Sequence, residues 1–351
     1  MTAIPKPTKT IDWRGLAARI WPAALAVGLA LLFGALLLLA SGRNPIEAYT
    51  ALLQGAFGSP ARLAETFVKM TPFLILAISV SVSFRCGFWN IGAEGQLILG
   101  AIASFSVALL LKSWPAVVVL PLSLLASVVG GALWSGIAGV LKARFNANEV
   151  ITTSMLNFIA VYLLAYIVNG PLKDPEGFNF PQSSLIAEAF QLPRFLAGSR
   201  LNIAFLVALV LVVVALLFWR STLGFRTEIV GASRRVATHV GLNVNRTVIL
   251  VALITGGVAG IAGWGEIFGI HYRLIDAIAV GMGSLAVVVA LLGDLHPLGM
   301  VVSAFLFAAL VVGGNAMERG AGVPFALVDV IQGSIILLVL ARAYIFRGRR
   351  S

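Results

Sequence analysis

The sequence predicts an all-α polytopic membrane protein of about ten transmembrane helices with both termini in the cytoplasm. First, 60% of its 351 residues are hydrophobic and only 11% are charged, which leaves too little polar surface for a soluble globule. Second, several apolar runs reach the roughly 18 to 25 residues that cross a bilayer as a helix. Third, most of the basic residues behind the net charge of +11 fall in segments assigned to the inside. The charge therefore reports topology and requires no nucleic-acid partner.

In chain order the expected spans cover residues 20–41, 70–84, 93–111, 116–141, 150–169, 201–219, 247–270, 277–292, 298–316 and 325–345. Residues 1–19 form a basic cytoplasmic segment, 20–345 the transmembrane domain and 346–351 a basic cytoplasmic tail. No small-residue cleavage pattern follows the first apolar run, so we interpret it as a retained span rather than a signal peptide. Small residues four apart, such as Gly256 and Gly260, indicate a tightly packed bundle.

The first outer loop, about residues 44–68, carries apolar side chains at helical spacing, including Ile46 and Leu53. This pattern predicts a short helix lying on the outer membrane surface. The second span begins at Thr71 and Pro72 and is short. We therefore expect it to tilt, or to break and continue into the glycine-rich stretch that follows.

Two longer loops are candidates for partner contacts. The outer loop 171–200 contains four prolines and is either a plain surface loop or a docking site for an extracytoplasmic partner. The inner loop 220–246 reads as one or two short amphipathic helices bounded by Gly224 and Gly241. Its length and internal apolar residues favour a packed partner surface over a simple basic loop.

The stretch 86-CGFWNIGAEGQLILG-100 places Asn90, Glu94 and Gln96 among glycines between two apolar runs. Such groups are costly at membrane depth unless they are buried against protein or face a water-filled path. They either line a path or form interhelical hydrogen bonds and caps, with Asn90 before the next helix and Glu94 in its first turn. Other polar residues in apolar surroundings are Asn148, Glu149, Thr152, Thr153, Asn157, Glu266, Asp276, Asp329 and Gln332. An amide-rich surface suits a neutral, hydroxyl-rich solute better than an ion.

The sequence lacks the motifs for ATP hydrolysis, for catalysis and for metal binding. There is no phosphate-binding loop, so this chain is not expected to hydrolyse ATP, and no catalytic residues are assigned. The single Cys86 cannot form an internal disulfide, and His239, His271 and His296 lie far apart, so neither a metal site nor a bound cofactor is expected. A secondary transporter would predict inverted repeats and an ion site, and no repeat stands out.

The stretch FRCGFWNIGAEGQLILGA resembles the F-N-I-G-A-E-G-Q signature of permease subunits of bacterial ABC importers, a group that includes nucleoside, ribose-type sugar and branched-chain amino acid systems. Four further stretches resemble the same family in the same order: 146-NANEVITTSMLNFIA-160, 224-GFRTEIVGASRRVATHVGLNV-244, 291-LLGDLHPLG-299 and 323-VPFALVDVIQGSIIL-337. Together they span roughly residues 70–345, and they are most similar to the nucleoside branch.

The resemblance implies an ABC importer permease fold in the bacterial inner membrane. It implies three partners: a cytoplasmic ATPase that uses ATP and magnesium, a second and different permease chain, and an extracytoplasmic binding protein or lipoprotein. Nucleosides are the first candidate solute, with ribose-type sugars and riboflavin-like heterocycles as alternatives. The residues implied to line the translocation path or gate are Asn90, Glu94, Gln96, Asn148, Glu149 and Asn157.

The inner loop resembles the family's coupling segment, E-A-A-x-x-x-G, with Arg235 in place of the glutamate. Glu228 stands where relatives often carry arginine, so we hypothesise that Glu228 and Arg235 compensate each other, directly or through the ATPase groove. The residues implied to couple to the ATPase are Glu228, Gly231, Arg234, Arg235, Ala237 and Gly241. Within 275–297 two partial matches to the family compete, so path residues there stay open.

Overall fold

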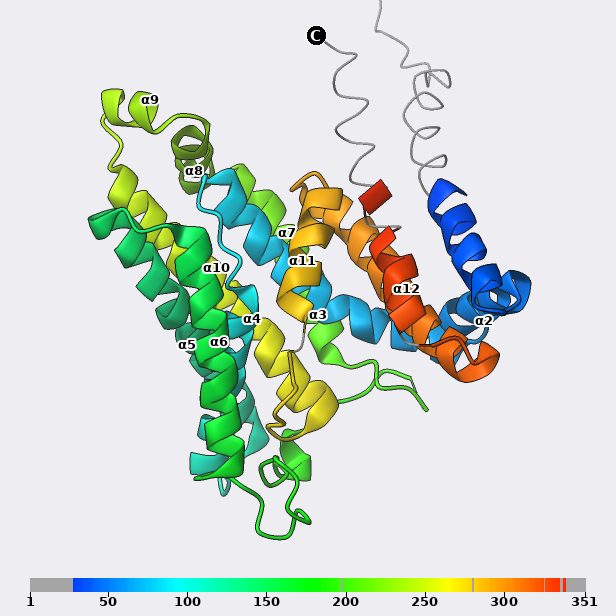
Figure 1. Ribbon diagram of the computed structural model, residues 1–351. Coiled ribbons are helices and arrows are strands. Elements are labelled where there is room, and N and C mark those ends of the chain that lie inside the picture. The colour runs from blue at the N-terminus through cyan, green and yellow to red at the C-terminus, as the bar shows by residue number, and fades with distance from the viewer. Residues whose placement is uncertain (1–27, 197, 280, 325, 335–336, 339–351) are drawn as a thin grey trace, which may run out of the picture. The chain divides into compact units, whose positions relative to one another are not determined.

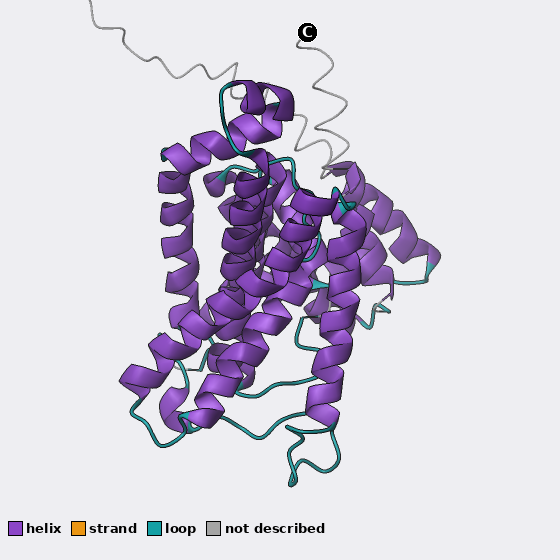
Figure 2. Cartoon of the chain, turned by 90° about the vertical axis from the view of Figure 1, so that its left-hand side faces the viewer, coloured by secondary structure: helices purple, strands orange, loops and turns teal. Residues whose placement is uncertain are grey.

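The computed structural model describes residues 28–196, 198–279, 281–324, 326–334 and 337–338. Throughout these ranges the regular structure is helical, and the only β pairing is two isolated bridges (Figures 1 and 2). The chain divides into two compact units, Met1–Leu52 with Gly314–Ser351, and Leu53–Gly313. Each is described by itself.

The helices follow one another in this order: α2 (Pro45–Phe57), α3 (Pro60–Arg85), α4 (Ala93–Leu110), α5 (Ala116–Phe145), α6 (Glu149–Asn169), the 3₁₀ turn η1 (Glu188–Phe190), α7 (Ile203–Trp219), α8 (Thr222–Ala232), α9 (Arg234–His239), α10 (Val244–Glu266), the π-turn η2 (Ile267–His271), α11 (Met282–Leu292) and α12 (Pro297–Ala321). A further apolar helix covers Gly28–Ala40.

Six of the described helices are long and apolar enough to cross a membrane: α3, α4, α5, α6, α10 with its π-turn, and α12. A seventh span results if α7 and α8, bent by 72° at their junction, are counted together. The chain is therefore a multi-pass membrane protein, as predicted. Residues 20–27 of the first expected span, residues 325, 335–336 and 339–345 of the last, and the terminal segments 1–19 and 346–351 lie outside the described residues. The total of ten spans and the side of each terminus stay predictions.

Helix α3 starts ten residues before the predicted span. The Ser59 hydroxyl accepts a hydrogen bond from the Arg62 backbone N–H (3.3 Å), and Pro60 opens the helix at a position that needs no N–H. The helix then continues through Pro72, which removes one donor to the Val68 carbonyl. The prediction of a short span that begins at Thr71 and Pro72 is thus wrong. Packing holds the helix together, because most of its residues are buried.

Close approach of helix backbones organises the interior of the larger unit. Helix α10 packs most extensively against α5. A Cβ atom at Gly256 would overlap the Gly131 carbonyl, and one at Gly260 would overlap the Ser127 carbonyl. The two helices approach this closely because their facing positions carry glycine or serine, which confirms the predicted tight bundle.

The predicted span 277–292 is wrong in extent. Helix α11 begins only at Met282, after Gly281 with φ +72°, and has 11 residues. At 1.5 Å per residue such a helix reaches about half of a hydrocarbon core. The apolar residues before it, including Ile278, form a buried turn instead.

The two long loops lie at opposite ends of the larger unit (Figure 1). At one end, loop 171–200 runs beside the π-turn region, where the backbone N–H of Ser183 donates to Leu274 O and that of Leu192 donates to Phe268 O. At the other end, loop 220–246 forms the two short helices α8 and α9, as predicted. In the smaller unit, the Tyr49 hydroxyl donates to Leu31 O (2.6 Å). The predicted helix in loop 44–68 exists as α2, and its place on the membrane surface stays a prediction.

Candidate functional site

Residues 86–92, which we call the unwound segment, separate α3 from α4. The chain leaves α3 at Cys86, turns at Gly87 with φ +69°, and re-enters helix at Ala93. The predicted helix break is therefore present. Non-helical backbone at membrane depth needs partners from elsewhere in the protein.

Two buried amides lie at this break, Asn90 within the unwound segment and Gln96 near the start of α4. Asn90 is fully buried and Gln96 almost so. The Gln96 Nε2 donates to Asn90 Oδ1 (3.0 Å), and the Asn90 Nδ2 donates to Gln96 Oε1 (3.3 Å). Asn90 Oδ1 also accepts from the Gly92 backbone N–H (2.9 Å). The two amides thus satisfy each other's hydrogen-bonding groups, and Asn90 also provides an acceptor for the backbone at the end of the unwound segment.

Helix α6 supplies the remaining partners. Asn157 Oδ1 accepts from the Gly95 N–H (2.8 Å), and its Nδ2 donates to the Ile91 carbonyl (3.0 Å). The Ile91 N–H in turn donates to the Thr153 hydroxyl (3.2 Å). Side chains of α6 therefore replace the helical hydrogen bonds that the unwound segment lacks. Asn90, Gln96 and Asn157 form one network, which we call the amide cluster.

Glu94 points from the first turn of α4 toward the start of α11. Its Oε1 lies 3.4 Å from the Gly281 N–H. A Cβ at Gly283 would lie 2.8 Å from the backbone N of Glu94, so the two helix starts are in backbone contact. Helix α11 has no side-chain cap of its own. The Glu94 carboxylate therefore lies at the positive end of that helix, where a negative charge is favourable.

The other two predicted path residues lie at the turn between α5 and α6. Asn148 caps α6, since its Oδ1 accepts from Val150 N (3.0 Å) and Ile151 N (3.3 Å). Glu149 pairs with Lys142 across the turn, with Nζ 2.7 Å from Oε2. Both residues thus have a local structural partner, and the Glu149 carboxylate also faces the Trp89 backbone of the unwound segment.

In the predicted coupling loop, Glu228 forms an ion pair with Arg85 at the end of α3. The Arg85 guanidinium also lies 3.8 Å from the centroid of the Trp219 ring at the end of α7. Arg234 and Arg235 are exposed on α9. The partner that the structure gives Glu228 is therefore Arg85, and the compensation by Arg235 stays a hypothesis.

Three small residues set the position of α8 and α9. A Cβ at Gly231 would overlap the Arg85 carbonyl, so α8 touches the end of α3 backbone to backbone. Ala237 of α9 is fully buried. Gly241, with φ +80°, turns the chain after the end of α9. Ala237 belongs to an apolar cluster with members from α3, α5, α8 and α10 as well.

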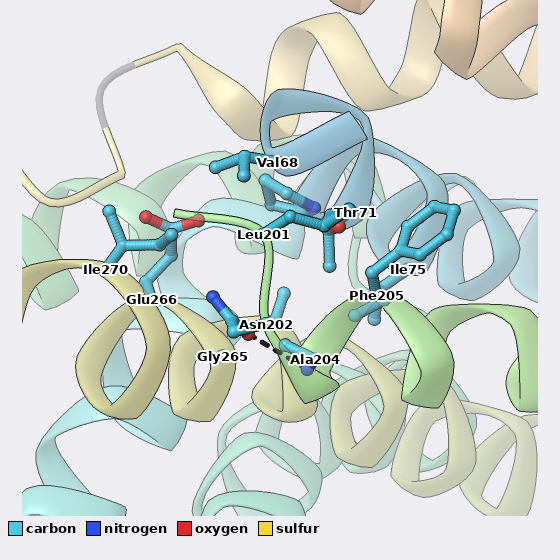
Figure 3. A pocket seen from close by; sticks show the side chains of 12 residues that line it. Val68, Thr71, Ile75, Leu201, Asn202, Ala204, Phe205, Gly265, Glu266 and Ile270 are labelled. Atoms are coloured by element: carbon cyan, nitrogen blue, oxygen red, sulfur yellow. Dashed lines mark hydrogen bonds between the residues drawn. The ribbon is translucent and has the colours of Figure 1, made fainter. Parts of the chain in front are cut away.

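One buried acid was named from the sequence but not assigned to a site. Glu266, at the end of α10, lines a cavity of about 10 Å³ between α3, α10 and the start of α7 (Figure 3), room for about one water molecule. It is 5% exposed, and its Oε2 lies 3.2 Å from His271 Nε2 without an aligned hydrogen bond. The sequence feature that could have identified this pair is an acidic residue followed five positions later by a histidine in an apolar run.

Within the described ranges, no group of three or more His, Cys, Asp or Glu side chains could hold a metal ion. The arrangement offers hydrogen-bonding amides and capped helix ends instead. Such groups can position polar solutes or backbone.

The comparisons with known proteins agree with one another. The family model described as "Branched-chain amino acid transport system / permease component" matches residues 62–340. The glucose ABC transporter permease protein TsgB13 of Haloferax volcanii is 36% identical over 93% of this chain and 88% of its own length. The guanosine ABC transporter permease protein NupP of Bacillus subtilis is 35% identical over 92% of this chain and 93% of its own. The nucleoside ABC transporter permease protein NupB of Lactococcus lactis is 32% identical over 91% of this chain and 90% of its own.

These matches run through the unwound segment, the amide cluster and the helices α8 and α9, and each is with a permease protein. The chain therefore belongs to the family of branched-chain amino acid transport system permease components, and it is a permease subunit of an ABC transporter.

Proposed function

We propose that this permease forms the translocation path of an importer for nucleosides. The amide cluster carries the proposal, because it holds an irregular backbone at membrane depth with uncharged side chains. Such backbone is tolerated where it is buried in protein or lines a cavity. Two of the three relatives named above are nucleoside or guanosine permease proteins.

A simple sugar is the second candidate solute. The observation that favours it is the relative named as a glucose permease, which is 36% identical to this chain. Ribose-type sugars and riboflavin-like heterocycles belong to the same alternative, since all are small and neutral. Membership in the permease family argues against a secondary transporter.

The proposal includes an ABC ATPase that hydrolyses ATP with magnesium and docks on α8 and α9. Three apolar side chains are exposed there: Phe225 on α8, Val236 on α9 and Val240 directly after α9, with exposed fractions of 63%, 54% and 61%. Exposed arginines surround them. Apolar side chains within a basic rim are typical of a surface that another protein covers. We call this the coupling surface.

A binding protein or lipoprotein would dock at the opposite end, on loop 171–200, and a second, different permease chain would complete the path in the bacterial inner membrane. Both termini would lie in the cytoplasm. Solute and nucleotide can drive the change between outward and inward openings only if they bind the two states with different affinity.

The solute is tested by uptake of radiolabelled adenosine, uridine, ribose and glucose in cells with the native operon, with and without this gene. Loss of nucleoside uptake on deletion, and its return with the wild-type gene, would support the proposal. Sugar uptake that depends on the gene, with nucleoside uptake unchanged, would assign the solute to sugars.

The role of Glu94 is tested in the same cells at matched membrane abundance. Glu94→Ala removes the acceptor at the start of α11, whereas Glu94→Gln keeps an oxygen there. We expect the Glu94→Ala variant to lose solute uptake and the Glu94→Gln variant to retain most of it. Full uptake with Ala would make Glu94 a dispensable cap.

A further inference from the structure

We propose that residues 85–92 transmit movement of α8 and α9 to the amide cluster, and that Arg85, Glu228 and Gly231 are the positioning residues of this transmission. The inference rests on the proposed function, because α8 and α9 carry the surface on which the ATPase is proposed to dock. It adds a structural route from that surface to the break between α3 and α4.

The first link is backbone contact. A Cβ at Gly231 would overlap the Arg85 carbonyl, and a Cβ at Gly87 would lie 3.5 Å from the Gly231 Cα. No side chain lies between the end of α8 and the start of the unwound segment. Because close-packed atoms transmit displacement with little slack, α8 cannot approach α3 without moving the segment.

The second link is charge. Arg85 closes α3, and its guanidinium pairs with Glu228 of α8 while lying over Trp219 of α7. One side chain thus joins three helices at the point where α7 bends into α8. This contact resists separation of α8 from α3, whereas the Gly231 contact resists their approach. Together they fix the segment to α8 in both directions.

The third link is a shared apolar cluster. Cys86 and Phe88 of the unwound segment are fully buried. They pack in one cluster with Val230 of α8, Ala237 of α9 and Val248 of α10. Phe88 is the largest fully buried side chain of this cluster. Residues 86–88 therefore belong to the same packed body as the two coupling helices.

The far end of the segment enters the amide cluster only two residues later. Asn90 binds Gln96, and Ile91 binds Asn157 and Thr153. Because residues 86–92 lack a helical hydrogen-bond ladder, they deform at lower cost than α3 or α4. A shift of Phe88 would thus reach Asn90 before either helix has to bend. The segment is a short hinge held at both ends.

Cys86 makes the movement measurable, because it is the only cysteine of the chain and is buried in the shared cluster. We would reconstitute the full complex in proteoliposomes and follow modification of Cys86 by N-ethylmaleimide, using peptide mass spectrometry. Rates are compared without nucleotide and after trapping with ATP and vanadate. ATP hydrolysis, retention of the ATPase and solute uptake are measured on the same preparations.

In the wild-type complex we expect trapping to change the Cys86 rate by about 2- to 30-fold, the range of couplings carried through packed networks. In Glu228→Ala the ATPase should remain bound and hydrolyse ATP, while the nucleotide effect on Cys86 and solute uptake are both lost. The double variant Arg85→Glu with Glu228→Arg should regain part of both. Glu65→Ala is the control, because it breaks a similar ion pair of α3 with Arg200 at the other end of the unit. Its Cys86 response should be that of the wild type.

A Glu228→Ala complex with the wild-type Cys86 response and uptake would overturn the inference. So would loss of the ATPase from that complex, since Glu228 would then act in docking. A wild-type complex that retains no ATPase, or shows no ATP-dependent uptake, would overturn the proposed function itself. The two failures are therefore distinguishable.

Discussion

The close contact between α5 and α10 makes a quantitative prediction at Gly256. Its Cβ position falls on the Gly131 carbonyl, which belongs to the facing helix backbone and has no rotamer to change. Gly256→Ala therefore forces the two helices apart along their whole contact. The neighbouring Gly257 is also buried, but its Cβ position lies 3.0 Å from a methyl group of Val128 and 3.3 Å from the Val128 carbonyl, so a shift of a few tenths of an ångström relieves the contact.

The magnitude follows from two opposing effects. Overpacking a buried contact costs about 3 kcal/mol at the upper end of the usual range. Replacing a helical glycine by alanine returns up to about 1 kcal/mol. The net loss for Gly256→Ala is thus about 2 kcal/mol, which lowers the melting temperature of a chain of this length by about 3 °C. Gly257→Ala receives the same helix gain with only the milder contact, so its melting temperature should lie above that of Gly256→Ala.

The assay is thermal unfolding in detergent with a dye that fluoresces on reaction with a thiol, since Cys86 becomes reactive only when its surroundings open. Both variants and the wild type are purified and melted side by side. Equal melting temperatures for Gly256→Ala and Gly257→Ala would refute the reasoning. In that case the backbones of α5 and α10 do not approach as described.

Two further outcomes follow from single contacts. Asn157→Ala leaves the Gly95 N–H without its acceptor and the Ile91 carbonyl without its donor, so it should cost about 1–3 kcal/mol and melt at a lower temperature than the wild type. Gly283→Val places side-chain atoms against the backbone of Glu94, so it should lower both the melting temperature and uptake, while Ser284→Ala, an exposed neighbour, should change neither.

The positions of most long helices could be predicted because the bilayer constrains them. The expected spans 93–111 and 150–169 agree with α4 and α6 to within one residue at each end. An uncharged run of that length leaves the chain few alternatives, since each backbone polar group must be satisfied within the helix. The two short helices of loop 220–246 were predicted for a similar reason, from apolar spacing between two glycines.

The boundaries that failed depend on tertiary packing. Pro72 suggested a helix start because proline lacks a donor, yet α3 passes through it, since neighbouring helices bury almost the whole span. In 277–292 an unbroken apolar run suggested a span. The left-handed turn at Gly281 instead shortens the helix. Hydrophobicity does not distinguish a buried turn from the first turns of a helix.

For the site, the sequence indicated which residues need partners but not which partners they find. Asn90, Gln96 and Asn157 were identified as polar groups in apolar surroundings, and the structure joins them in one cluster. The contact of Glu94 with Gly281 spans 187 positions of sequence. No local pattern predicts that a carboxylate in the first turn of one helix will lie at the start of another.

Glu228 is a residue whose partner could not be predicted from the sequence. Glu228 stands where relatives often carry arginine and Arg235 where they carry glutamate, which suggested that the two compensate each other. The two residues lie on separate helices, because α8 ends at Ala232 and Ser233 caps α9 as a new helix. Glu228 instead pairs with Arg85, 143 positions earlier. A charge exchange between Glu228 and Arg235 should therefore leave Arg85 facing a like charge, and restoration of uptake should require the exchange with Arg85.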